Sequence, residues 1–192
     1  MNRSPLLLAA AIAAAPVSAL AGGTAYTLDP AHTFPSFEAD HLGISVWRGK
    51  MDSSKGSAVI DRVAGSGTVE VAIDLRSVNF GLEDLNVWAR GSQFFDVDRY
   101  PTATYQGTLT DFVNGSPTRV TGKLTLHGVT HPLDLKLNSF RCIPHPMLKR
   151  EYCGADAYAV FDRSDYGLSA GKDWGFKMDV TLRIQVEALA DP

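Results

Sequence analysis

The sequence predicts an all-β domain of about eight antiparallel strands that closes into a barrel or packs as a sandwich. Several segments alternate apolar with polar residues at a period of two, which is typical of strands with one buried face. Turn signals rich in Gly, Asn and Pro separate these segments at short intervals. Short connections favour antiparallel pairing, because parallel neighbours need a long crossover.

The longest expected strand lies near the C-terminus, where apolar residues occupy every second position. These residues are Met178, Val180, Leu182, Ile184 and Val186. Other strands are expected at residues 56–61, 68–75, 102–112 and 118–126, and a further strand starts near residue 130 and includes alternating Leu133, Leu135 and Leu137. His127 and Gly128 predict a tight hairpin turn between two of these strands.

One segment, residues 81–91, has the spacing of a short helix. Leu82, Leu85 and Ala89 recur at helical intervals, and Gly91 is a suitable stop. A second helical turn is expected near residues 168–171. Because about eight antiparallel strands leave two edges unless they close, a barrel with room for one small ligand is a natural solution.

The N-terminus reads as a secretory signal peptide. Arg3 supplies the positive start, residues 6–15 are apolar, and Ala19-Leu20-Ala21 forms an A-x-A cleavage pattern. Cleavage is expected after Ala21, with Ala19 as the runner-up. A membrane anchor or a core helix is the alternative, but a spanning helix needs roughly 20 apolar residues. We therefore expect an exported protein with a signal peptide at 1–21 and one domain at 22–192.

Charge and hydropathy exclude several classes of function. The formal net charge is −3, and acidic and basic residues are interspersed along the chain. Without a basic run, nothing supports a nucleic-acid surface. No second apolar stretch of spanning length follows, so the mature protein is expected to be soluble.

Cys142 and Cys153 are the two cysteines of the chain. In an oxidising compartment, an even pair this close in sequence predicts a disulfide. The alternative is a metal site in which His145 joins the two cysteines. A tetrahedral zinc site also needs a fourth ligand or an open position, and His145 lies between two prolines in an expected loop, so no metal is expected.

Six motifs, in order, resemble the YceI-like, polyisoprenoid-binding family. They read YTLDPAHT (26–33), HLGIS (41–45), RGSQFFD (90–96), GKLTLHGVTHPL (122–133), RSDYG (163–167) and DVTLRIQVE (179–187). The resemblance implies a lipocalin-like antiparallel β-barrel of about eight strands with one or two short helices. It also implies a periplasmic carrier that holds a long-chain isoprenoid, quinone-like or similar amphiphilic lipid inside the barrel, in place of a cofactor.

The resemblance carries an alternative as well. Family members are associated with stress responses and with membrane cytochromes, so an interaction module with a membrane cytochrome partner is the second hypothesis, and a homodimer is compatible with both. Two features depart from the family pattern. Trp88 stands where members have a histidine, and the excursion between Cys142 and Cys153 looks like a subgroup feature.

His32 and His41 are the candidate catalytic residues, and an enzyme that uses one of them is the third hypothesis. No nucleophile signature accompanies either histidine, so we expect structural histidines and no enzyme activity. Arg90 and Asp96 are expected to form an ion pair. Aromatic and apolar residues of the first two thirds of the chain are expected to line the ligand pocket: Phe37, Ile44, Val46, Leu85, Trp88, Phe94, Phe95 and Tyr105.

Overall fold

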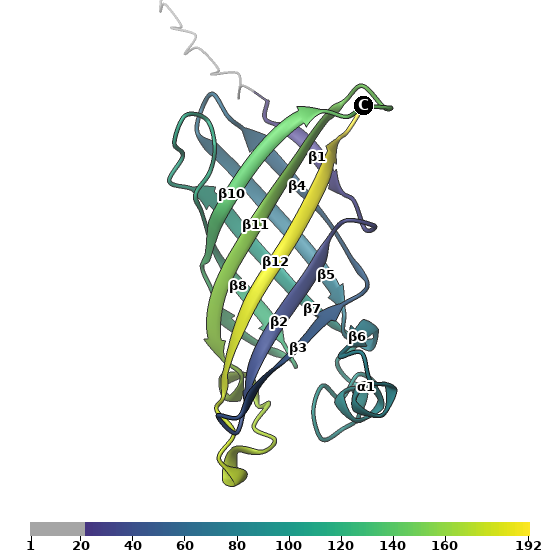
Figure 1. Cartoon of the computed structure of the whole chain (residues 1–192). Helices are drawn as coiled ribbons and strands as arrows, with labels where there is room; N and C mark the ends of the chain where they lie inside the picture. Colours follow the sequence, from purple (N-terminus) through teal and green to yellow (C-terminus); the bar gives the residue numbers. More distant parts are fainter. Residues whose placement is uncertain (1–21) are drawn as a thin grey trace, which may run out of the picture.

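The computed structural model describes residues 22–192, so the signal peptide expected at 1–21 lies outside the described part. Eight strands form a closed antiparallel ring, in the order β1-β4-β5-β7-β8-β10-β11-β12 and back to β1 (Figure 1). The predicted barrel is thereby confirmed. The ring strands are β1 (Thr24–Leu28), β4 (Ser54–Asp61), β5 (Ser66–Asp74), β7 (Thr102–Thr110), β8 (Arg119–Leu126), β10 (Leu135–Pro144), β11 (Glu151–Asp162) and β12 (Asp179–Ala190).

Four further strands extend the ring at one end. They are β2 (Phe34–His41), β3 (Ser45–Met51), β6 (Val78–Asn79) and β9 (Val129–Pro132). β1 and β2 lie end to end along β12, because β1 pairs with its last residues and β2 with residues 180–185. The β2–β3 hairpin thus continues the wall past the level at which β1 and β4 pair.

The period-two pattern of β12 is confirmed. Val180, Leu182, Ile184 and Val186 line the interior, while Arg183 and Gln185 between them are exposed. The tight turn is confirmed too, since His127 and Gly128 both have positive φ, at 52° and 78°. Such a pair of angles is the signature of a hairpin turn that matches the twist of its strands.

The helix α1 (Glu83–Arg90) confirms the helix expected at 81–91, with Gly91 as its C-cap. Leu82 is the exception: it is the N-cap residue and is exposed rather than packed. The helical turn expected at 168–171 is wrong. The 3-10 helices η2 (Arg163–Tyr166) and η3 (Lys172–Trp174) flank that stretch, with Gly167 as the C-cap of η2 and Gly171 as the N-cap of η3, both at positive φ. A third 3-10 helix is η1 (Leu75–Ser77).

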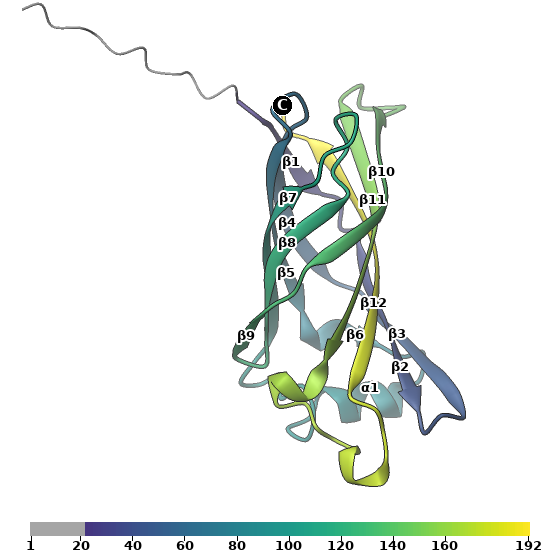
Figure 2. The same cartoon turned by 90° about the vertical axis from the view of Figure 1, so that its left-hand side faces the viewer.

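The two ends of the barrel differ. One end carries the short β4–β5, β7–β8 and β10–β11 turns, together with residue 22 and the C-terminus. The other end carries the β2–β3 tip, α1 and the loop between β11 and β12 (Figures 1 and 2). Across residues 22–192, no helix has both the length and the apolar character that crossing a membrane would require.

Candidate functional site

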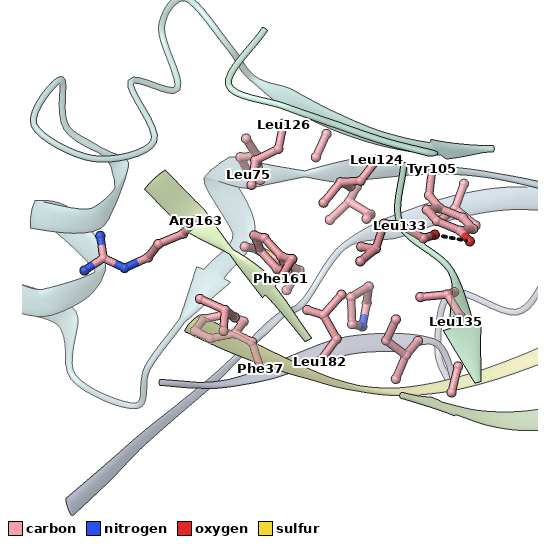
Figure 3. A pocket seen from close by; sticks show the side chains of 18 of the residues that line it. Phe37, Leu75, Tyr105, Leu124, Leu126, Leu133, Leu135, Phe161, Arg163 and Leu182 are labelled. Carbon is pink, nitrogen blue, oxygen red and sulfur yellow. Dashed lines mark hydrogen bonds between the residues drawn. The ribbon is translucent and has the colours of Figure 1, made fainter. Parts of the chain in front are cut away.

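A cavity of about 640 Å³ runs along the inside of the barrel. Its wall extends from Phe140 and Cys153, near the turn-bearing end, to Trp88 and Trp174 at the end that carries α1. Nearly all of the labelled side chains in Figure 3 are aliphatic or aromatic. A volume of this size is typical of ligand sites, which are concave and mostly apolar.

Small side chains on β11 make room for the cavity. Ala155 and Ala157 line it, and Ala159, at the next alternate position of the same face, is buried. A Leu or Phe at each position would fill the space that these alanines leave. Sequence reasoning missed them because alanine is compatible with a packed core as well as with a void. The available signal was three alanines in a row on one face of a strand.

Six of the eight predicted lining residues lie on the cavity wall. They are Phe37, Leu85, Trp88, Phe94, Phe95 and Tyr105. Trp88 from α1 stacks on Phe94, with 5.1 Å between ring centroids, and Phe94 packs against the edge of Phe95 at 4.7 Å. Helix α1 and the segment after it therefore supply an aromatic corner of the site. Whether these residues contact a ligand stays a prediction.

The prediction that Ile44 and Val46 line the cavity is wrong. Both lie on the β2–β3 hairpin and are exposed, Ile44 by 79%. The hairpin reaches past the closed part of the barrel, so no opposite wall faces them. The neighbouring Trp47 does line the cavity, and sequence reasoning missed it together with Trp174.

Arg163 is the buried cation of the cavity wall. It is 7% exposed, and its guanidinium donates to the carbonyl oxygens of Leu168 and of Ala170, the latter at 2.7 Å. Within residues 22–192 it forms no ion pair, and burial lowers its pKa. Its guanidinium also lies 5.6 Å from the centre of the Phe94 ring. Figure 3 places it at the opposite end of the labelled set from Tyr105.

Tyr105 is the phenol inside the cavity wall. It is 6% exposed, and its hydroxyl donates to the carbonyl oxygen of Leu133 at 2.9 Å. Its ring lies against Gly122, where an added Cβ would overlap the phenol oxygen. Burial raises its pKa, so it stays a neutral donor.

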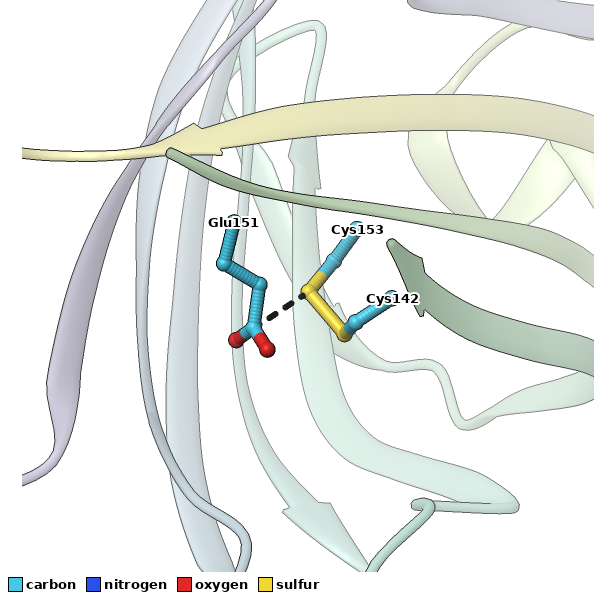
Figure 4. Close-up of side chains that lie close together, drawn as sticks. All are labelled: Cys142, Glu151 and Cys153. Atoms are coloured by element: carbon cyan, nitrogen blue, oxygen red, sulfur yellow. Dashed lines mark hydrogen bonds between the residues drawn. A yellow bond between two sulfur atoms is a disulfide. The ribbon is translucent and has the colours of Figure 1, made fainter. Parts of the chain in front are cut away.

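A disulfide lies near the turn-bearing end of the cavity, where Cys153 is part of the wall. Cys142 of β10 and Cys153 of β11 face one another in register and are joined, which confirms the predicted pair (Figure 4). Glu151 lies beside them, with a carboxylate oxygen 3.9 Å from the Cys153 sulfur, and accepts a hydrogen bond from Tyr26. Burial, followed by this bond, raises the pKa of Tyr26 to about 12.

The disulfide leaves no thiolate for the alternative metal site. His145 also has another role, because its Nδ1 accepts hydrogen bonds from the backbone N–H groups of Met147 and Leu148, at 3.2 and 3.1 Å. It therefore shapes the turn between β10 and β11. Arg90 likewise differs from expectation: it pairs with Glu83 at 2.6 Å, while Asp96 lies 3.7 Å from Arg99.

The two candidate catalytic histidines have separate surroundings. His32 Nδ1 lies 2.8 Å from Asp29, whose carboxylate also accepts from the Tyr152 hydroxyl at 2.7 Å. The hydrogen bond to Asp29 raises the pKa of His32. His41 stacks on Trp47 with 4.2 Å between ring centroids. Neither arrangement places a serine or thiol nucleophile beside the ring.

A family model described as "YceI-like domain" matches residues 26–188 of the chain. A UPF0312 protein of Pseudomonas aeruginosa is 35% identical over 106 residues, which are 55% of each protein, so the chain spans about half the length of such relatives. A UPF0312 protein of Vibrio parahaemolyticus is 32% identical over 139 residues, 71% of this chain and 73% of the relative.

Two solved structures share the fold. BcnA of Burkholderia cenocepacia is similar with a TM-score of 0.64 and 18% identity, covering 83% of this chain and 98% of its own. A polyisoprenoid binding domain from Saccharophagus degradans, implicated in plant cell wall breakdown, is similar with a TM-score of 0.61 and 21% identity, covering 88% and 99%.

Proposed function

The chain belongs to the YceI-like family, and on that premise we propose that it binds the long apolar chain of an isoprenoid or similar amphiphilic lipid inside its barrel. The observation that carries the proposal is the apolar cavity of about 640 Å³. An apolar cavity without an occupant loses packing contacts along its whole wall. A lipid chain supplies those contacts, and its own apolar surface is removed from water at the same time.

The size of the cavity supports a long ligand. A methylene group is nearly as large as a water molecule, whose share of liquid volume is roughly 30 Å³. The cavity therefore holds on the order of twenty methylene-sized groups. Each buried methylene contributes about 0.8 kcal/mol, so such a chain binds firmly after the cost of immobilising it, with few polar contacts.

The ligand class has further support from a structural relative. The Saccharophagus degradans protein with the same fold is a polyisoprenoid binding domain. Our proposal assigns the same class of ligand to this chain, with the methyl-branched chain packed against the alanine face of β11 and the aromatic rings of Trp88, Phe94 and Phe95.

The head group is proposed to lie near Arg163. Two of the guanidinium N–H groups are used by backbone carbonyls, and the others have no carboxylate partner in residues 22–192. Arginine presents five donors, so donors remain for an oxygen atom of the ligand. A quinone-like carbonyl or an anionic oxygen meets that requirement, and a purely hydrocarbon end does not.

We place this function in the periplasm, as a carrier or scavenger. The expected signal peptide supports that location, and a disulfide persists in an oxidising compartment. A lipid is insoluble in the aqueous space beside membranes, which is the reason for a protein that encloses it. The proposed role is binding, with no chemical step assigned to the chain.

Native mass spectrometry of the gently purified full chain tests the proposal. The expected result is an added mass that fragments as an isoprenoid or related lipid, together with uptake of an isoprenoid quinone by ligand-free protein. Ligand-free protein that also takes up no isoprenoid lipid would overturn it.

The interaction hypothesis needs a separate experiment. A membrane cytochrome partner and a homodimer stay expectations of the family resemblance. Crosslinking in periplasm and membranes, followed by sizing of the products, tests both. Recovery of a specific cytochrome by lipid-free protein favours the interaction module over the carrier.

A further inference from the structure

Exposed apolar residues gather at the end of the barrel that carries α1. We call Leu42, Ile44, Trp47, Trp88 and Trp174 the rim. They come from three segments that are far apart in the sequence: the β2–β3 hairpin, α1 and the loop that contains η3 (Figures 1 and 2). Ile44 and Trp174 are the most exposed, at 79% and 80%. We propose that the rim docks the protein on the surface of a phospholipid bilayer.

The rim is continuous with the cavity. Trp47, Trp88 and Trp174 line the cavity and are exposed to solvent at the same time. A lipid chain that enters or leaves between these rings passes from one apolar environment to another. On a bilayer surface the transfer avoids water, and this continuity is the reason for choosing a bilayer as the occupant.

The residue types of the rim suit a membrane interface. Tryptophan concentrates where lipid head groups meet hydrocarbon, because its ring is large and apolar and its N–H is polar. Proteins that lie on membranes insert such side chains a short distance into the head-group region. Large exposed apolar patches on soluble domains mark interaction sites. The rim has tryptophan rings suited to the membrane interface and also forms an exposed apolar surface.

Charge is mixed around the rim. Lys172 and Lys177 are exposed on either side of Trp174 in the sequence, but Asp173 is exposed between them, and Lys177 lies 3.9 Å from Asp40. The net electrostatic attraction to an anionic surface is therefore small. Binding is expected to depend on burial of the rim side chains and to change little with salt concentration.

The opposite end provides a matched control. Val63 and Met147 are even more exposed than most of the rim, at 101% and 82%, and lie at the β4–β5 and β10–β11 turns. Neither lines the cavity. A comparison of the two ends therefore separates docking at the mouth from nonspecific stickiness of any exposed apolar side chain.

The experiment is co-flotation of the protein without its expected signal peptide (residues 22–192) with protein-free vesicles of phosphatidylcholine and phosphatidylglycerol, at low and high salt. The intact protein is expected to float, with a blue shift of tryptophan emission. The variant Leu42→Ser/Ile44→Ser, whose two residues do not line the cavity, is expected to partition about tenfold less onto the vesicles, because each large side chain contributes burial energy. Val63→Ser/Met147→Ser is expected to float like the intact protein.

Three results would overturn the proposal: no flotation of the intact protein, equal losses in both double variants, or binding to native membranes but not to protein-free vesicles. The last result would indicate a membrane protein as partner. Lipid content by native mass spectrometry is read in the same variants. A rim variant that keeps its lipid but no longer floats supports docking independently of the proposed carrier function.

Discussion

The hydroxyl of Tyr105 and the carbonyl of Leu133 meet at the point where β9 ends and β10 begins, with 2.9 Å between their oxygen atoms. β9 pairs with residues 123–126 of β8, whereas β10 pairs with residues 119 and 120. Leu133 lies between these two ladders. Its carbonyl is satisfied by a side chain from β7, so the break in the wall leaves no unpaired acceptor there.

Removing the Tyr105 hydroxyl tests how much its hydrogen bond to Leu133 contributes to stability. Tyr105→Phe is expected to lower the free energy of unfolding by about 1–2 kcal/mol, because the buried carbonyl of Leu133 loses its donor. Urea denaturation measures the change. Tyr158→Phe on the outer face of β11 is the control and is expected to have no measurable effect. Equal losses in the two variants would contradict this account.

The alanine face of β11 predicts that one larger side chain closes the site. Ala155→Phe is expected to abolish lipid binding while changing the free energy of unfolding by less than about 1 kcal/mol, since the ring enters empty space. Native mass spectrometry reads the bound lipid. Val160→Phe, on the exposed face of the same strand, should keep its lipid. Full lipid occupancy in Ala155→Phe would show that the lipid does not bind in the cavity.

The disulfide between Cys142 and Cys153 closes a short loop, with a sequence separation of 11. The variant Cys142→Ala/Cys153→Ala is expected to be less stable by about 3 kcal/mol on the chain-entropy model. Thermal unfolding with and without reductant measures this. Reductant should lower the midpoint of the intact protein and leave that of the variant unchanged. An intact protein that is insensitive to reductant would speak against a stabilising bond.

His32 predicts a pH dependence with a definite sign. The hydrogen bond to Asp29 raises its pKa above the usual 6.5, so the protonated ring is favoured in the folded state. The resulting stabilisation is present below pH 6.5 and is lost as the pH rises through the folded-state pKa. NMR titration of the His32 ring measures that pKa.

Asp29→Asn is expected to return the pKa of His32 towards its ordinary value. Asp84→Asn, which changes an exposed carboxylate on α1, serves as the control and should leave the titration in place. If His32 titrates identically in all three proteins, the ion pair with Asp29 does not form in solution.

Arg163 predicts coupled effects on stability and ligand choice. Arg163→Gln is expected to lower the free energy of unfolding by about 3 kcal/mol, because the carbonyls of Leu168 and Ala170 lose charged donors. The bound lipids should also shift away from those with anionic or carbonyl head groups. Arg76→Gln, which removes an exposed pair with Asp74, is the control and should leave the free energy of unfolding nearly unchanged. An unchanged lipid profile in Arg163→Gln would refute the head-group assignment.

The strands and the helix could be predicted because their signals are local. The alternation in β12 reflects one face turned to the interior, and α1 follows from Leu85, Ala89 and Gly91. The boundaries shifted where tertiary contacts decide them. β10, for example, continues to Pro144 because it pairs with β11 as far as Glu151.

The site was only partly predictable, because lining a cavity is not a local property. Phe37 lies on β2 and Ile44 in the turn between β2 and β3, yet Phe37 faces the cavity and Ile44 faces solvent. The difference arises where the hairpin extends past the closed ring, which no pattern of period two records. The same limit hid Arg163, whose role depends on the loop that folds back over it.

The placement of the two chain ends has a practical consequence. Thr24 pairs with Ile60, and Ala190 with Tyr26, so both ends of the described chain lie on the far side of the barrel from the rim (Figure 1). A tag or a surface tether attached at either end therefore leaves the opening unobstructed. Protein immobilised through its C-terminus would present a uniform, outward-facing orientation, suited to measuring adhesion to a bilayer one molecule at a time.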